Sequence, residues 1–362
     1  MNDYFCVLPF YGVEIGHDNA QNIYCCRLQP STDIEEVRQS ILAQQRPSAC
    51  STCWKLEDQA LTSERQVHNR TFDFYLDRDL EKIEQDVIDG NYSSKIVKLS
   101  TSNLCNSTCV TCNSVASSAW ASLERKKINY DKLQHSEIEK IDWQHITQLS
   151  FVGGEPLLEK LNFEVLNRLI ESRNTDCFIS IVTNGSCELS SAQFETLSQF
   201  RNLNICLSID GVGPRFEYMR YPLKWDLLCQ NLEKFKSITS NISVSAMISN
   251  VNIFYYSELI EFLHEHKLNY LCKQVEFPRY FSPAQLPDNY KQLVLDHNPH
   301  YRDQVQSFLN MGTYNKTLFS LCCREIGRQD QLKNISIADY LPVNLLQEST
   351  VELGNFGKSF SK

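Results

Sequence analysis

Three cysteines lie close together in the segment Cys105-Asn-Ser-Thr-Cys109-Val-Thr-Cys112, which follows a strand-like run at Ile96–Ser100. The spacing C-x3-C-x2-C lets three thiolates converge on one soft metal centre. A cubane [4Fe–4S] cluster has four irons, so three ligands would leave one iron open to another molecule. The spacing could also align thiols on a buried helix face, but the intervening Asn, Ser, Thr and Val residues disfavour a helix interior. Zinc is the stronger alternative, although it usually takes four ligands from C-x2-C pairs.

Three further motifs follow in order: Gly153-Gly154-Glu155-Pro156, Thr183-Asn184-Gly185 and Ser208-Ile209-Asp210-Gly211. Each comes at the end of a strand-like run, which is where parallel α/β sheets place their chemistry. The glycines allow a ligand to approach the backbone closely, and Glu155 offers a carboxylate to a cation. Short hydroxyl and carboxylate side chains suit a ribose or an α-carboxylate. Ordinary turns remain an alternative for all three motifs.

With these motifs in this order, residues 96–280 resemble the radical S-adenosylmethionine (radical SAM) superfamily. The resemblance implies that Cys105, Cys109 and Cys112 hold a [4Fe–4S] cluster whose open iron chelates S-adenosylmethionine. An electron from the cluster would cleave this cofactor to a 5′-deoxyadenosyl radical, which abstracts a hydrogen atom from the substrate. One position departs from the pattern: Thr111 stands where many relatives carry a bulky residue.

The resemblance also implies which residues contact S-adenosylmethionine and what supplies the electron. Glu155 and its motif would pair with the ammonium of the cofactor, and Ser208 would lie near it. Arg220 and Asn250 resemble polar sites of the family. An electron donor such as flavodoxin or ferredoxin would be a partner. The implied cofactor-binding residues are Gly153, Gly154, Glu155, Pro156, Thr183, Asn184, Ser208, Asp210 and Asn250.

A second group of cysteines lies near the N-terminus. Cys50-Ser-Thr-Cys53 is a C-x2-C knuckle, and Cys6 would face Cys25 across a predicted hairpin. Four thiolates satisfy a fully ligated auxiliary [4Fe–4S] cluster, while a zinc knuckle is the alternative. Neighbouring strand residues point to opposite faces, so only one of Cys25 and Cys26 is expected to be a ligand, and we choose Cys25. The module resembles the Twitch module, a shortened SPASM domain, but precedes the barrel instead of following it.

Two adjacent cysteines, Cys322 and Cys323, lie near the C-terminus. Either could donate a hydrogen atom or complete a cluster, although most adjacent cysteines in C-terminal segments do neither. The scattered cysteines are expected to be small buried hydrophobic residues. These are Cys177, Cys187, Cys206, Cys229 and Cys272.

Composition restricts the class of protein. The 362 residues are 42% hydrophobic and 22% charged, which describes a soluble globular protein of two or three domains. A net charge of −9 argues against a nucleic-acid partner. No apolar run is long enough to span a bilayer, so no membrane is expected. Fifteen cysteines, an odd number, and no secretory signal favour metal ligands in the reducing cytoplasm.

Strand-like and helix-like segments alternate from Ile96 onward, which predicts an α/β fold with a parallel sheet. Six such units, not eight, predict an open, partial (β/α)6 TIM-like barrel, and the resemblance implies the same shape. The predicted strands are Ile96–Ser100, Ile146–Val152, Cys177–Val182, Leu203–Ile209, Ile242–Ile248 and Lys273–Phe277. The amphipathic helices include Leu157–Ser172, Trp225–Lys236 and Ile253–Lys267.

Three domains are expected from this alternation. Residues 1–95 would form the auxiliary cluster module with a linker helix, residues 96–285 the radical SAM partial barrel, and residues 286–362 a helical C-terminal extension. Within the first, the apolar run Phe5–Ile15, a turn at 17–19 and the strand Asn22–Cys25 would form a hairpin. Helices are predicted at Asp33–Gln44 and Phe72–Asp89.

These features predict an enzyme that modifies a peptide or protein by oxidation, crosslinking or epimerisation, as in the maturation of ribosomal peptide products. Family members with auxiliary modules mostly have such substrates, although others act as dehydrogenases or epimerases on small sugars or aminocyclitols. A non-catalytic, zinc-stabilised binding protein is the alternative from another class. That alternative leaves the ordered Gly-Gly-Glu-Pro and Thr-Asn-Gly motifs unexplained.

Overall fold

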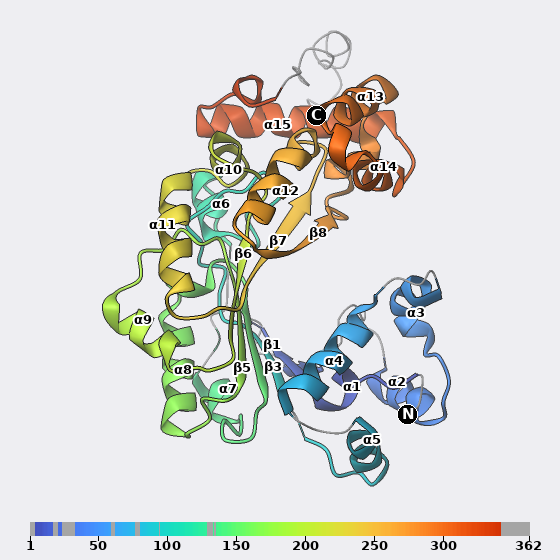
Figure 1. The fold of residues 1–362 in the computed structure, drawn as a ribbon, viewed down its shortest axis with the longest axis vertical. Helices are drawn as coiled ribbons and strands as arrows, with labels where there is room; N and C mark the ends of the chain where they lie inside the picture. Colours follow the sequence, from blue (N-terminus) through green and yellow to red (C-terminus); the bar gives the residue numbers. More distant parts are fainter. Residues whose placement is uncertain are drawn as a thin grey trace. The chain divides into compact units, whose positions relative to one another are not determined.

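The chain forms two compact units in the computed structural model (Figure 1). The structure describes residues 4–16, 21–23, 33–58, 62–76, 80–93, 95–128, 133 and 135–341. The first unit comprises Met1–Asn103, Asn129–Val182 and Leu189–Ile205, and the second comprises Leu104–Ile128, Thr183–Glu188 and Cys206–Lys362. The cysteine loop therefore belongs to the second unit and the Gly-Gly-Glu-Pro motif to the first.

The first unit is built mainly on parallel strands, with helices packed against them, and its strand β2 is antiparallel. Its strands are β1 (Gly12–Ile15), β2 (Gln21–Ile23), β3 (Ile96–Ser100), β4 (Gln148–Val152), most of β5 (Phe178–Thr183) and the start of β6 (Leu203–Ser208). Its helices are α1 (Leu8–Tyr11), α2 (Ile34–Leu42), α3 (Ser51–Asp58), α4 (Glu64–Leu76), α5 (Leu80–Ile88), α7 (His135–Glu139), α8 (Lys160–Glu171) and α9 (Ser191–Ser198). Short 3-10 turns occur at Ser48–Cys50 and Pro156–Leu158.

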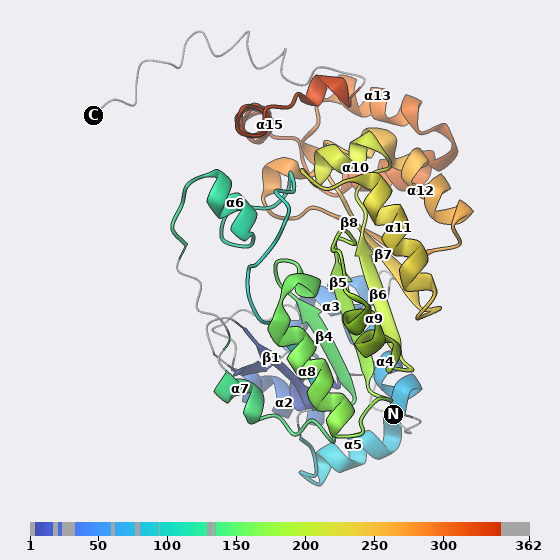
Figure 2. The same ribbon diagram turned by 90° about the vertical axis from the view of Figure 1, so that its left-hand side faces the viewer.

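The second unit carries the remaining strands and a helical C-terminal region. Its strands are the end of β6, β7 (Ile242–Ile248) and β8 (Asn269–Gln274). Its helices are α6 (Ser118–Leu123), α10 (Pro214–Met219), α11 (Trp225–Lys236), α12 (Tyr256–Glu265), α13 (Asp288–His297), α14 (Arg302–Asn310) and α15 (Lys316–Lys333). The 3-10 turns are Ile253–Tyr255, Arg279–Phe281, Pro283–Gln285, Pro299–Tyr301 and Ile337–Asp339. Helices α13, α14 and α15 gather at one end of this unit (Figures 1 and 2).

The strand order is β2-β1-β3-β4-β5-β6-β7-β8, and strand β6 begins in the first unit and ends in the second. The registers are parallel for β1 with β3, β3 with β4, β4 with β5 and β7 with β8, whereas β2 pairs with β1 in the antiparallel direction. The sheet is open, with helices packed against it. The predicted α/β class and open parallel sheet are therefore confirmed, as is the helical C-terminal region.

Short β-branched and apolar runs explain the central strands. Val97 and Leu99 on β3 face Leu149 and Phe151 on β4 in register, and all four side chains are buried. Strands that are covered on both faces have nearly continuous apolar sequences. The positions of these strands could be predicted because their sequences show this pattern. Helix α8 lies along the sheet in both views and buries one stripe containing Val165, Leu166 and Leu169 (Figures 1 and 2).

Two predicted elements have different bounds. The last strand was expected at Lys273–Phe277 but begins at Asn269 and ends at Gln274. As an edge strand it leaves its first residues exposed, so it lacks the apolar signal, while Phe277 is 82% exposed and precedes a proline.

The helix expected at Phe72–Asp89 is instead two helices, α4 and α5, and α4 begins at Glu64. The Gln66 amide donates to the Ser63 hydroxyl and the Ser63 amide donates to the Gln66 side chain, both at 3.2 Å. This reciprocal cap ends the preceding loop and starts the helix early. Capping-box residues were present in the sequence, so this start could have been read from them.

The predicted N-terminal hairpin exists in part. Strands β1 and β2 pair with Val13 opposite Ile23, whereas the predicted turn at 17–19 and the residues from Tyr24 to Cys26 lie outside the described residues. Cys6 is not on the hairpin, because Pro9 lies in the first turn of a short helix, α1, that separates Cys6 from β1. The hairpin also joins the main sheet through β3.

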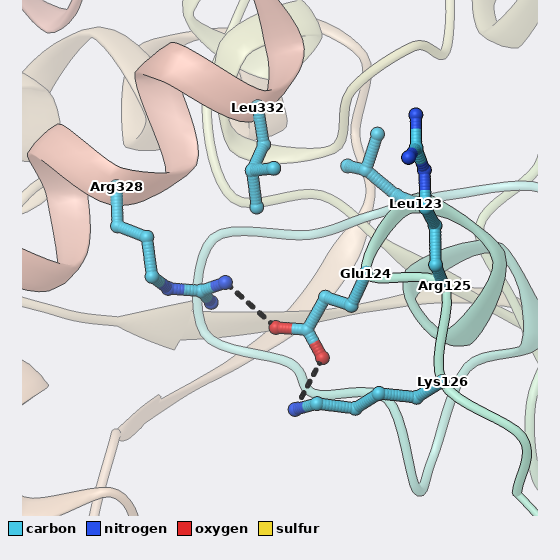
Figure 3. Close-up of a pocket in the computed structure, with 6 residues that line it drawn as sticks. All are labelled: Leu123, Glu124, Arg125, Lys126, Arg328 and Leu332. Atoms are coloured by element: carbon cyan, nitrogen blue, oxygen red, sulfur yellow. Dashed lines mark ion pairs between the residues drawn. The ribbon is translucent and has the colours of Figure 1, made fainter.

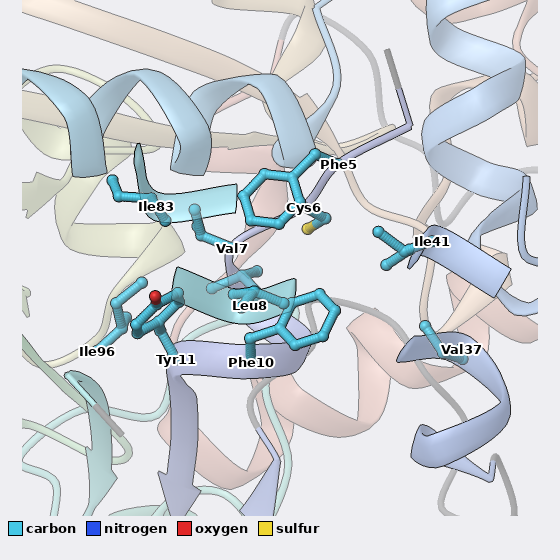
Figure 4. Close-up of a cluster of buried hydrophobic side chains, with 11 residues drawn as sticks. Phe5, Cys6, Val7, Leu8, Phe10, Tyr11, Val37, Ile41, Ile83 and Ile96 are labelled. Atoms are coloured by element: carbon cyan, nitrogen blue, oxygen red, sulfur yellow. The ribbon is translucent and has the colours of Figure 1, made fainter. Parts of the chain in front are cut away.

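A hydrophobic cluster ties the N-terminal segment to α2 and α5 (Figure 4). Phe5 and Phe10 stack with ring centroids 5.8 Å apart, and Leu8 and Ile41 are almost fully buried beside them. Among the described residues, no helix is both long enough and apolar enough to cross a bilayer.

Neighbouring positions on α2 give a test of this packing. Ile41 is 1% exposed and Leu42 is 42% exposed. We expect Ile41→Ala to lower the free energy of unfolding by about 2–5 kcal/mol, because it removes buried methyl groups and leaves a cavity. Leu42→Ala should change it by no more than about 0.5 kcal/mol. Urea unfolding followed by circular dichroism measures both, and equal losses in the two variants would contradict the cluster in Figure 4.

Candidate metal centre at the cysteine loop

The segment that carries Cys105, Cys109 and Cys112 is an irregular loop in the second unit, without helical structure between the cysteines. The alternative of a buried helical stripe is therefore wrong. The Ser107 hydroxyl lies 3.3 Å from the sulfur of Cys105 and 3.3 Å from the sulfur of Cys109. One hydroxyl thus holds two of the three thiols at the same point of the loop.

Hydrogen bonds from distant segments fix this loop. The Thr108 amide donates to the carbonyl of Tyr221 at 2.6 Å, and the Val110 amide donates to the carbonyl of Met219 at 2.8 Å. The Ser117 hydroxyl, which caps α6, also donates to the carbonyl of Ser107 at 2.7 Å. The loop backbone is therefore held by α6 on one side and by the end of α10 on the other.

A buried cation stands beside one thiol. The Arg220 guanidinium donates to the sulfur of Cys109 at 3.8 Å and pairs with Asp210 at 2.7 Å. Asp210 accepts a second hydrogen bond from the Met247 amide at 2.8 Å. Asp210 and Arg220 are both buried, so each charge depends on the other. The geometry connects the end of β6 to the cysteine loop through Arg220.

Burial keeps the thiols of Cys109 and Cys112 protonated in the protein alone. It raises the pKa of Cys109, although Arg220 and Ser107 act in the opposite direction. It raises the pKa of Cys112 to about 12. Iron bound in place of the protons would remove this desolvation cost. Three soft thiol donors in a loop with a cation beside them fit an iron–sulfur cluster.

No three His, Cys, Asp or Glu side chains within the described ranges converge around a single metal-ion position. The cysteines of a cubane cluster bind different irons at its corners, so they stand farther apart than the ligands of one ion.

The Gly-Gly-Glu-Pro motif is a tight turn at the end of β4 in the first unit. Gly153 has a φ of +122°, and a Cβ at this position would lie 2.7 Å from the carbonyl oxygen of Ser102. The Gly154 amide donates to that same carbonyl at 3.1 Å. Glu155 is 2% exposed, and its carboxylate accepts from the Leu157 amide at 3.2 Å. Glycine is required here because the end of β3 passes against the turn.

Asn184 and Thr183, from the Thr-Asn-Gly motif, have different roles in the structure. The side-chain amide of Asn184 donates to the side-chain oxygen of Asn106, inside the C-x3-C segment, at 2.7 Å. The Thr183 hydroxyl accepts from the Gly185 amide at 3.0 Å and closes the turn after β5. Ser208, at the end of β6, is half-buried. Asn184 is therefore brought to the cysteine loop, whereas Thr183 is used within its own turn.

Asn250 and Cys322, predicted for separate roles, contact each other. The Asn250 amide lies 3.3 Å from the sulfur of Cys322 and also donates to the carbonyl of Tyr280 at 2.8 Å. Burial raises the pKa of the Cys322 thiol far above its usual range. Cys323 is buried beside it on α15.

The N-terminal cysteines lie in the first unit. Cys6 belongs to the hydrophobic cluster of Figure 4, and Cys50 packs against that cluster. Cys53 is buried on α3. Cys25, the fourth predicted ligand, and its neighbour Cys26 lie outside the described residues. The described cysteines form no disulfide.

Two residues that touch the cysteine loop, Trp120 and Gln329, have no signal in the sequence, and neither has Lys333, which supports Gln329. The Trp120 indole donates to the carbonyl of Cys109 at 2.9 Å. The side-chain amide of Gln329 donates to the carbonyl of Val110 at 3.0 Å. The Lys333 ammonium donates to the side-chain oxygen of Gln329 at 3.1 Å. Gln329 and Lys333 come from α15, far away in the chain, so no local pattern could assign them to the loop.

Comparison with solved structures finds distant similarity. Native anSMEcpe with bound AdoMet is 16% identical over 61% of this chain and 63% of that chain, with a TM-score of 0.43. The Streptococcus suis protein SuiB bound to S-adenosylmethionine is 17% identical over 86% and 73%, with a TM-score of 0.41. SuiB bound to its precursor peptide SuiA is 15% identical over 91% and 78%, with a TM-score of 0.39. This chain thus matches less than two thirds of the anSMEcpe chain.

No curated protein matches this chain. Residues 97–225 match the family described as a 4Fe-4S single cluster domain, and this stretch holds the cysteine loop, Asp210 and Arg220. The matched stretch lies within residues 96–280, the part of the chain that resembles the radical SAM superfamily.

Proposed function

We propose that this protein is a radical SAM enzyme that cleaves S-adenosylmethionine reductively and uses the resulting 5′-deoxyadenosyl radical to remove a hydrogen atom from a peptide or protein. The observation that carries the proposal is the cysteine loop. It offers three thiols in an irregular segment, and Arg220 and Asn184 contact it. A [4Fe–4S] cluster bound there would supply the electron and an open iron.

The residues around the loop have defined tasks in this proposal. Arg220 places a positive charge beside Cys109 and so offsets the negative charge that thiolates and an added electron bring. Asp210 orients Arg220, since its carboxylate is fixed by the Met247 amide. Asp210 was predicted as a cofactor contact, and both of its oxygens already have protein partners. We therefore assign Asp210 a positioning role.

We propose the contacts to S-adenosylmethionine that the resemblance to radical SAM proteins implies. Glu155 would pair with its ammonium, and Ser208 and Asn250 would bind polar groups of the cofactor. The turn at Gly153 supports this assignment, because a tight glycine turn that buries a carboxylate is more than a strand-to-helix connection requires.

We also propose an auxiliary [4Fe–4S] cluster, with Cys6, Cys50, Cys53 and Cys25 as ligands. Cys50 packs against the cluster of residues that contains Cys6, and this supports a shared site for the two thiols. A peptide substrate is proposed because family members with such modules mostly modify peptides. A low-potential carrier such as flavodoxin or ferredoxin would supply electrons.

The metal content tests the two sites. After anaerobic reconstitution, the protein should hold iron and sulfide for two clusters. The triple change Cys105→Ala, Cys109→Ala and Cys112→Ala should remove about half of the iron, because the sites have separate ligands. Cys177→Ala is the matched control, since this thiol is also buried and belongs to neither group of proposed ligands. Zinc in place of iron in the purified protein would reject the enzyme in favour of a zinc-stabilised binding protein.

The glycine turn tests cofactor binding. Gly153→Ala should weaken S-adenosylmethionine binding by at least about tenfold, because the new Cβ displaces Ser102 and the turn that holds Glu155. Gly213→Ala is the control: its φ is +56°, but a Cβ there meets nothing within 4 Å. Equilibrium dialysis of the iron-loaded variants gives the affinities. Equal binding by both variants would reduce the motif to an ordinary turn.

The auxiliary site is tested by single conservative changes. Cys50→Ser and Cys53→Ser should each leave the iron of one cluster and still release 5′-deoxyadenosine from S-adenosylmethionine with a chemical reductant. The physical reason is that a fully ligated cluster has no open iron for the cofactor. Iron content and chromatography of the nucleoside measure the two effects. Unchanged iron in both variants would remove the auxiliary cluster from the proposal.

A further inference from the structure

A depression of about 430 Å³ opens on the second unit, where the end of α6 meets α15 (Figure 3). Charged side chains dominate its lining, with one leucine from each side. The lining residues are Leu123, Glu124, Arg125, Lys126, Arg328 and Leu332. No role assigned above uses this depression.

Positive charge exceeds negative charge around the depression. Glu124 forms ion pairs with Arg328 at 2.8 Å and with Lys126 at 2.7 Å (Figure 3). Arg328 also pairs with Glu325 at 2.6 Å. We define the basic patch as the exposed cations of this face, three in succession after α6 and two that lie one turn apart on α15. They are Arg125, Lys126, Lys127, Arg324 and Arg328.

Glu124 and Glu325 balance only part of this charge. Burial alone would raise the pKa of Glu124, but hydrogen bonds from Lys126, Ser114 and Arg328 outweigh it and lower the pKa. The carboxylate is therefore ionised and serves to hold two of the cations in place. The patch remains positive on a chain whose net charge is −9.

The basic patch is connected to the cysteine loop by direct contacts. The Arg328 guanidinium lies 5.7 Å from the centre of the Trp120 ring, and Trp120 is 1% exposed. The Trp120 indole in turn donates to the carbonyl of Cys109 at 2.9 Å. One aromatic side chain thus separates the surface cation from the backbone of a predicted cluster ligand.

We propose that the basic patch docks an acidic, low-potential electron-carrier protein, and that its electron enters the cysteine loop beside Trp120. The inference rests on the proposed function and adds the place where its redox partner binds. In the step, the reduced carrier loses one electron and the cluster held by the loop gains it. No proton or atom is transferred between the two proteins.

Electrostatics favour this partner. An acidic carrier is repelled by the negative charge of the chain as a whole and attracted by the patch, so encounters are oriented toward Trp120. Electron-transfer complexes are small and transient, and a charged face of a few side chains around a shallow depression suits them. Such steering weakens as ionic strength rises.

The test uses the full-length, cluster-loaded protein with an acidic bacterial flavodoxin as the probe. The variant Arg125→Glu with Lys127→Glu reverses two exposed cations of the basic patch. The matched control is Lys234→Glu with Lys267→Glu, two exposed lysines elsewhere on the second unit. Both variants change the net charge equally, so only the position of the charge differs.

We expect the patch variant to weaken flavodoxin binding, measured by calorimetry, by about tenfold or more at low ionic strength. Reduction of the cluster by flavodoxin hydroquinone, followed by the loss of the visible absorbance of the cluster, should slow by a similar factor. The rate of the control variant should stay near that of the wild type. Reduction by photoreduced 5-deazariboflavin, which needs no docking surface, should be the same in all three proteins. Iron content confirms that the clusters are intact.

Equal effects of the two variants on flavodoxin binding would overturn the docking site. So would unchanged flavodoxin binding together with loss of poly-glutamate binding, since the patch would then recognise an acidic peptide. Failure of the proposed function has a different signature: no 5′-deoxyadenosine forms even with deazariboflavin, whereas flavodoxin affinity still reports on the patch.

Discussion

The buried contact between Arg220 and Asp210 is the constraint on which the cysteine loop depends. Both groups lie out of water, so either charge alone would be costly, and together they occupy a fixed position. Asp210 follows β6 and accepts a hydrogen bond from the backbone of β7, so the sheet fixes the position of Arg220 through Asp210. Arg220 then stands 3.8 Å from the sulfur of Cys109. The chemistry of the loop is thereby tied to the most regular part of the second unit.

The loop itself has no regular structure, and its shape comes from neighbours distant in sequence. Tyr221, Gln329 and Asn184 each bind it through a backbone or side-chain hydrogen bond. An irregular loop leaves backbone groups that need partners, and here the C-terminal helix α15 provides one of them. The C-terminal region is consequently part of the unit that holds the cysteines and cannot be treated as an appendage to it.

Helix α6 and helix α15 serve two purposes at once. On their inner side Trp120 and Gln329 support the cysteine loop. On their outer side lie the cations of the basic patch, two on α15 and three in the segment that follows α6. A redox centre needs a fixed environment that excludes water, and it also needs a route by which electrons reach it from the surface. A thin layer made of two helix segments satisfies both requirements, because Trp120 contacts the loop and an exposed arginine together.

The sequence by itself determined the parts that depend on local patterns. Apolar runs located β3 and β7, and the ordered motifs located the turns at Gly153 and Asn184. The cysteine spacing predicted a cluster at the loop, and the loop is irregular as that prediction requires. It misplaced β8, since an exposed edge strand carries no burial pattern. Only the tertiary structure decided that Trp120 and Gln329 touch the loop, because hydrogen bonds between residues far apart in the chain leave no periodic signal.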